Sequence, residues 1–95
     1  MSLDTTRVPV PGNRIAARIV SGQALVLDPA ATELRRMNEV GSFVWGLISE
    51  RRFTVAQIHQ AIVEEFDVEV GTALSDLETF LEKLHTQGVI TYITD

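Results

Sequence analysis

The hydrophobic period of the sequence changes near residue 38. Before this point, short runs of alternating apolar residues are bounded by Gly and Pro, a pattern typical of strands. These runs predict strands over 14–20, 24–28 and 32–37. After it, apolar residues recur every three or four positions, a pattern typical of amphipathic helices. The repeats predict helices over about 38–49, 54–66 and 70–87. Strands followed by helices indicate an α+β domain with three N-terminal antiparallel strands.

Local signals support the predicted helix boundaries. Asn38 is a favourable N-cap, and Thr54 with Gln57 forms a capping box. Gly88 suits the end of the last helix, and the β-branched residues of 89–93 predict a short terminal strand. The last two helices and this strand have the outline of a winged helix-turn-helix.

Composition and length limit the size and class of the domain. The chain has 95 residues, of which 45% are hydrophobic, so one packed domain is expected. We assign this domain to residues 14–95. The polar and Pro-rich residues 1–13 are expected to be a flexible arm or the lead-in to an edge strand. No apolar run is long enough to span a bilayer, and no signal-peptide core is visible, so a cytoplasmic protein is expected.

Few residues are suited to catalysis. The sequence has no Cys, which excludes thiolate metal sites and Cys nucleophiles. His59 and His85 are far apart in sequence, and no Ser lies in a nucleophile motif. We therefore expect no enzyme activity, no cofactor and no metal site.

The charge distribution disfavours nucleic acid and anionic membranes as partners. The net charge is −5, and residues 53–95 carry eight acids against one Lys. The third predicted helix, which would be the recognition helix, has Asp76, Glu78 and Glu82 beside Lys83. DNA phosphates require Lys and Arg on this surface.

Two features indicate a peptide-binding module instead. Phe80 lies at the border of the Leu stripe of the third helix, between Asp76 and Lys83, where it either lines a groove or belongs to the core. The third strand contains Arg35 and Arg36, which either favour an acidic guest strand or protect an exposed edge. Trp45 falls off the apolar stripe of the first helix, which predicts a partly exposed contact residue or a half-buried one.

Several segments together resemble the PqqD-like proteins. The resemblance covers about residues 14–92, and the order and spacing of the segments carry it. The matching segments are ALVLDP (24–29), NEVGSFVWGLI (38–48), FTVAQI (53–58), EEFDV (64–68), SDLETFLEKL (75–84) and GVI (88–90). The sequence departs from the family pattern at Met37, at Gly71 and after the first helix, where Ser-Glu-Arg-Arg replaces Asp-Gly.

The resemblance implies a winged-helix-like recognition element for ribosomally made, post-translationally modified peptides (RiPPs). Such domains hold the leader of a precursor peptide as an added strand and present the peptide to a modifying enzyme, often a radical S-adenosylmethionine protein, as in pyrroloquinoline quinone synthesis. The residues implied to line the leader groove are Thr32, Glu33, Leu34, Arg35, Arg36, Met37, Asp76, Phe80 and Lys83. Two alternatives are a DNA-binding transcriptional regulator and a structural subunit that forms a homodimer through its strand edge.

Overall fold

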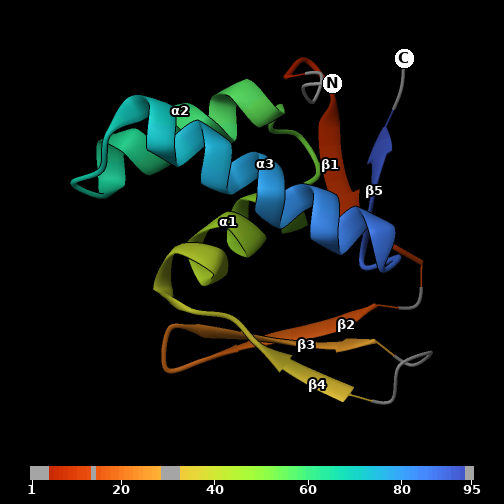
Figure 1. Ribbon diagram of the computed structural model, residues 1–95. Coiled ribbons are helices and arrows are strands. Elements are labelled where there is room, and N and C mark those ends of the chain that lie inside the picture. Colours follow the sequence, from red (N-terminus) through yellow and green to blue (C-terminus); the bar gives the residue numbers. More distant parts are fainter. Residues whose placement is uncertain (1–4, 14, 29–32, 94–95) are drawn as a thin grey trace.

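The computed structural model describes residues 5–13, 15–28 and 33–93 and contains two small antiparallel sheets and three helices (Figure 1). The elements follow the order β1 (Val8–Pro11), β2 (Ala16–Val20), β3 (Gln23–Asp28), β4 (Glu33–Arg36), α1 (Glu39–Ser49), α2 (Val55–Glu65), α3 (Val70–Thr86) and β5 (Ile90–Ile93). One sheet has the strand order β2-β3-β4, and the other pairs β1 with β5. The predicted α+β class is confirmed, with the three predicted strands forming the first sheet.

The predicted arm differs from the structure in one segment. Val8–Pro11 forms β1, which pairs with β5 in the register Pro9↔Tyr92, and both Pro9 and Val10 are buried. This strand is hard to predict from the sequence, because two of its four residues are prolines and proline cannot donate a hydrogen bond to a β-ladder. The chain just before β1 is also fixed, because the carbonyls of Thr5 and Arg7 accept hydrogen bonds from the first turn of α2.

The N-terminal three-stranded sheet is formed by two hairpin connections. Ser21 and Gly22 join β2 to β3 with φ angles of 51° and 80°, as a tight primed turn between antiparallel strands requires. β3 then pairs with β4 in the register Leu25↔Arg36. β4 is therefore an edge strand of this sheet, as the resemblance implies.

Helix α1 lies between the two sheets, which changes its buried face from the predicted one (Figure 1). The spacing of apolar residues in this helix predicts a buried stripe of Val40, Phe43, Val44, Leu47 and Ile48. Val44 and Ile48 are buried as predicted, but Phe43 and Leu47 are half-buried and Val40 is exposed. Trp45 is instead 1% exposed and belongs to the core, so the expectation of a half-buried or contact residue was wrong. Strands β1 and β3 and helix α2 all contact α1, so its buried residues do not form a single stripe.

Ser42 is a buried polar residue at the join between α1 and the three-stranded sheet. Its Oγ accepts a hydrogen bond from the amide of Ala24 in β3, at 2.7 Å, and donates one to the carbonyl of Met37, at 3.2 Å. The Met37 amide in turn donates to the Ala24 carbonyl, at 3.0 Å. These bonds fix the end of β4 and the start of α1 against β3.

We predict that Ser42→Ala lowers the free energy of unfolding by about 1–3 kcal/mol, because the buried Ala24 amide loses its acceptor. Urea denaturation followed by circular dichroism measures this change. Ser49→Ala is the matched control, because the Ser49 hydroxyl only bonds the Trp45 carbonyl within the same helix. Equal effects of the two substitutions would contradict the prediction.

Helix α1 ends without the glycine that is usual in this position. Arg51 follows the C-cap with a φ of 60°, in the left-handed region. This conformation costs a residue with a Cβ atom more than it costs glycine. The sequence departure after the first helix therefore introduces a strained residue and leaves the turn intact.

We predict that Arg51→Gly raises the free energy of unfolding by about 0.5–1 kcal/mol, because glycine adopts positive φ without strain. The midpoint of urea denaturation reports the change. Glu50→Gly is the control, since Glu50 has an ordinary helical φ of −79° and gains nothing from glycine. A loss of stability in Arg51→Gly would contradict the strain argument.

Candidate functional site

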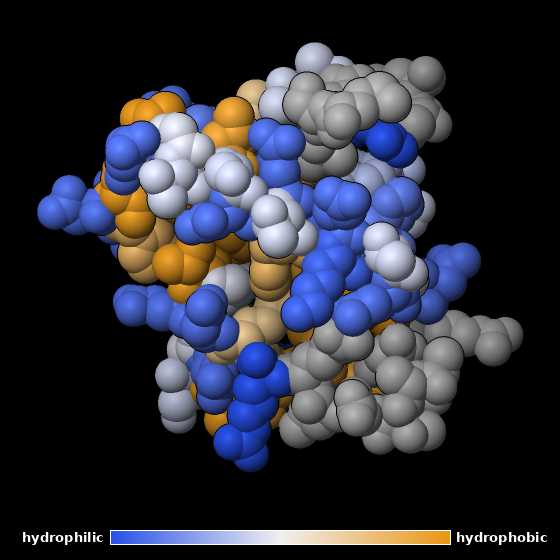
Figure 2. Space-filling view, in the orientation of Figure 1, coloured by the Kyte–Doolittle hydropathy of each residue, from blue (hydrophilic) through white to orange (hydrophobic). Residues whose placement is uncertain are grey.

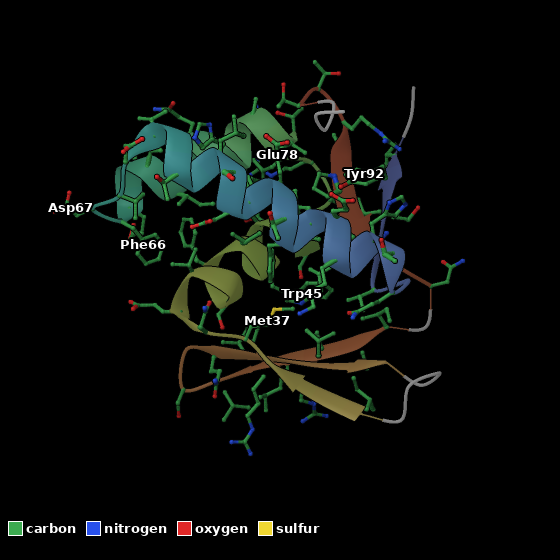
Figure 3. The ribbon with its side chains drawn as sticks, viewed as in Figure 1. Met37, Trp45, Phe66, Asp67, Glu78 and Tyr92 are labelled. Atoms are coloured by element: carbon green, nitrogen blue, oxygen red, sulfur yellow. The ribbon has the colours of Figure 1, made fainter. Side chains whose placement is uncertain are left out.

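A groove runs between α3 and the edge of the three-stranded sheet, with the start of α1 at its base. Its cavity volume is about 660 Å³, and it is lined by the end of β4, the first turns of α1, one side of α3 and Val68 of the α2–α3 loop. Figure 2 shows apolar surface in this region between hydrophilic side chains, and Figure 3 shows Met37 and Trp45 between the sheet and the helices.

The base of the groove is apolar and tightly packed. Met37 and Leu77 are buried, and Phe80 is half-buried against them. Gly41 lets these side chains come together, because a Cβ atom there would lie 3.3 Å from the Met37 Cβ and 3.5 Å from the Phe80 ring. Asn38 fixes this turn by accepting a hydrogen bond from the Gly41 amide at 2.8 Å.

One end of the groove is open and apolar. Val40 and Val68 are 37% and 39% exposed and line the groove from α1 and from the α2–α3 loop. The ring of Phe66, in that loop, packs edge-on against Phe43 of α1, with ring centroids 5.4 Å apart. This contact ties the loop to α1 and so sets the width of the apolar end.

The rim of the groove is polar and mainly cationic. Arg36 borders the groove from β4 and Lys83 borders it from α3, and both side chains are exposed. Asp76, also on α3, is the acid in the lining. None of these three forms an ion pair with a side chain that the structure describes. The rim can therefore attract opposite charges on a guest.

The backbone of β4 adds hydrogen-bonding capacity beside the groove. β4 pairs with β3 on one side, and within the described residues its other edge has no strand partner. An unpaired edge offers alternating amide and carbonyl groups to an extended guest chain.

The two histidines and the acids of the described residues do not come together in the groove. No group of three or more His, Asp or Glu residues in the described part of the chain is placed to hold a metal ion. His59 contacts the Val70 carbonyl at 2.9 Å, and the His85 ring packs against Tyr92, so both lie outside the groove lining. No helix in residues 5–13, 15–28 and 33–93 is long and apolar enough to cross a membrane.

The family model of coenzyme PQQ synthesis protein D (PqqD) matches residues 23–90. The chain belongs to the PqqD family. Comparison of this PqqD-family chain with the curated proteins gives no match.

Two solved structures have the same fold as this PqqD-family protein. The first, TbiB1 in complex with the TbiA(beta) leader peptide, is 22% identical, has a TM-score of 0.80, and the match covers 90% of this chain and 99% of that one. The second, lasso peptide synthetase B1 complexed with the leader peptide, is 17% identical, has a TM-score of 0.77, and the match covers 88% and 98% of the two chains.

The structure brings together five of the residues predicted for the site. Arg36, Met37, Asp76, Phe80 and Lys83 all line the groove, although Met37 is buried in its base and follows β4 instead of ending it. Their role in peptide binding stays a prediction.

The other four predicted residues are described in part or not at all. Glu33, Leu34 and Arg35 contribute described backbone to β4, but their side chains are outside the described part, and Thr32 lies outside it altogether.

The sequence patterns did not indicate the apolar end of the groove. Val40 was assigned to the core stripe, and Val68 and Thr72 had no assigned role. The exposure of Val40 could have been predicted from its position. It lies in the first turn of its helix, where a side chain can project past the sheet.

Two glycines in α1 provide a test of the groove base in this PqqD-family protein. We predict that Gly46→Ala raises the free energy of unfolding by about 0.5–1 kcal/mol, because a Cβ atom there meets nothing and alanine favours helix. Gly41→Ala should gain less or lose stability, because its Cβ would crowd the side chains of Asn38 and Met37. Thermal unfolding measures both, and equal gains would contradict the packing described for the groove base.

Proposed function

We propose that this chain captures the leader of a ribosomally made precursor peptide as an added strand on β4 and presents that peptide to a modifying enzyme. The observation that carries the proposal is the unpaired edge of β4 beside an apolar groove that α3 closes on the opposite side. The two structures of similar fold support it, because both are complexes with leader peptides.

The size of the groove fits a short extended segment. The lining residues of α3 extend from Thr72 to Leu84, a distance of about 18 Å at 1.5 Å per residue. A strand that rises 3.4 Å per residue covers this length with about five residues. Alternate side chains of such a segment would point into the groove, where Phe80 and Gly41 form an apolar base.

Backbone pairing and side-chain recognition would play different roles. Pairing with β4 supplies affinity for many sequences, since it uses main-chain groups only. The groove supplies selectivity, because a bulky apolar side chain fits its base and an acidic one suits Arg36 and Lys83. Asp76 in the same lining favours a leader of mixed charge over a purely acidic one.

The chain is proposed to act as an adaptor without catalytic activity of its own. In this role the chemistry belongs to a partner, either a radical S-adenosylmethionine protein or another peptide-modifying enzyme, in pyrroloquinoline quinone synthesis or a related pathway. We place this step in the cytoplasm, where the precursor is synthesised.

The alternatives make different predictions. A DNA-binding regulator would bind duplex DNA in a salt-sensitive manner, which a gel shift detects, but the acids of α3 oppose this. A homodimer formed through β4 would appear in light scattering and would compete with leader for the same edge.

We predict that Phe80→Ala weakens leader binding by about tenfold or more, because a half-buried aromatic anchor is lost. Arg36→Glu and Lys83→Glu should each weaken it several-fold, more at low salt, because they reverse the charge of the rim. Fluorescence anisotropy measures these affinities, with labelled leader segments of candidate precursor peptides taken from any short open reading frames found near the gene.

Arg18→Glu is the matched control, because Arg18 is an exposed arginine of the same sheet that does not line the groove. Circular dichroism confirms that each variant is folded, and the exposed Lys83 keeps the test valid if Phe80→Ala unfolds. Unchanged affinity in both Arg36→Glu and Phe80→Ala would remove the groove assignment.

A further inference from the structure

The face of the three-stranded sheet that points away from the helices is unusually apolar. The strand register places Leu27 between Ala16 and Leu34, and it places Leu25 between Arg18 and Arg36. Ala24 and Val26 alternate with these residues and are fully buried under α1, which identifies Leu25 and Leu27 as facing outwards. Side chains on this side of the sheet point away from the helices in Figure 3.

The apolar residues on this outer face are accessible. Leu27 is 42% exposed and Val20 is 50% exposed, and Leu25 is half-buried between two exposed arginines. When one face of an antiparallel sheet is in contact with solvent, the residues that point to that face are normally polar. Apolar residues at most of these positions indicate a surface that another molecule covers.

The charge of this face differs from that of the whole molecule. The outward positions of β2, β3 and β4 hold Arg18 and Arg36 and no acid, whereas the chain has a net charge of −5. The two arginines lie on either side of Leu25, on the two outer strands. Neighbouring strands are 4.7–4.9 Å apart, so the two strands that carry them are separated by about 10 Å.

We propose that this outer face, formed by Ala16, Arg18, Val20, Leu25, Leu27 and Arg36, docks the enzyme that modifies the peptide. The matching surface on that enzyme is an apolar patch with a carboxylate on each side, about 10 Å apart, one for each arginine. The identity of the partner rests on the proposed function, but the surface does not, since most of it lies outside the leader groove.

The charges favour this partner over a second copy of the chain. A two-fold contact through the same face would bring the Arg18 and Arg36 pair of one copy close to the pair of the other without any acid between them. Like charges in a closed interface are costly. A partner with carboxylates at these points avoids this cost.

The arrangement also lets the leader and the enzyme bind at the same time. The leader is proposed to pair with the edge of β4 and to fill the groove on the helical side, whereas the outer face lies on the opposite side of the sheet. Arg36 is at the junction, because it borders the groove and shares a row with Leu25 on the outer face. Arg18 is therefore the better residue for separating the two interactions.

The test uses isothermal titration calorimetry to measure binding of a purified peptide-modifying enzyme, chosen from those encoded near the gene, with and without the leader segment. Leu27→Asp and Arg18→Glu should each weaken enzyme binding by tenfold or more and leave the leader affinity unchanged. The matched control is Ile19→Asp, because Ile19 is 56% exposed on the same sheet but faces the opposite side, in register with the buried Ala24. It should bind the enzyme as the wild type does.

Each other outcome overturns the proposal. Enzyme binding that is unaffected by both variants, or lost equally in Ile19→Asp, means that the outer face is not the docking surface. A wild-type dimer in light scattering that Leu27→Asp converts to a monomer means that a second copy covers this face. If the wild-type chain does not bind the enzyme at all, the docking proposal is also wrong. Leader binding, measured in parallel, then shows whether the proposed function itself still holds. Arg18→Glu keeps the test valid if Leu27→Asp perturbs the fold, because Arg18 is exposed.

Discussion

The hydroxyl group of Ser42 holds together the elements on which the groove depends. It bonds the Ala24 amide and the Met37 carbonyl and so fixes β3, the end of β4 and the start of α1 relative to one another. Burial makes this arrangement specific, because a buried amide without an acceptor is costly and no other position of α1 supplies one here. With the sheet fixed in this way, the unpaired edge of β4 lies beside α3 and the space between them stays open.

In the proposed roles, the three-stranded sheet presents two different surfaces to other molecules. Its edge, beside the groove, combines backbone pairing groups with an apolar base and a cationic rim at Arg36 and Lys83. Its outer face combines Leu25 and Leu27 with Arg18 and Arg36. A three-stranded sheet is thin enough that a guest on one side and an enzyme on the other are brought close together. This arrangement gives the proposed adaptor a physical basis for bringing peptide and enzyme together.

The departures from the family pattern are accommodated locally. Arg51 adopts the positive φ that a glycine would take, at a modest cost in stability, and Met37 occupies the base of the groove as a flexible apolar side chain. Gly71 lies in the first turn of α3, is exposed, and a Cβ atom there would meet only the end of the Glu69 side chain. These positions are compatible with the fold of the PqqD family, to which the chain belongs.

The sequence by itself determined the helices and their ends, the three strands of the larger sheet and five residues that line the groove. The helices and strands depend on local signals, such as the Asn38 cap and the Thr54–Gln57 capping box, both of which form as predicted. The groove residues were implied by the resemblance to the PqqD-like proteins. Only the tertiary structure decided that β1 pairs with β5, that Trp45 is buried and that Val40 and Val68 open one end of the groove. Each of these depends on contacts between segments far apart in the chain. A helix packed on more than one side has no single apolar stripe, and a strand with two prolines is stabilised by its partner and not by its own sequence.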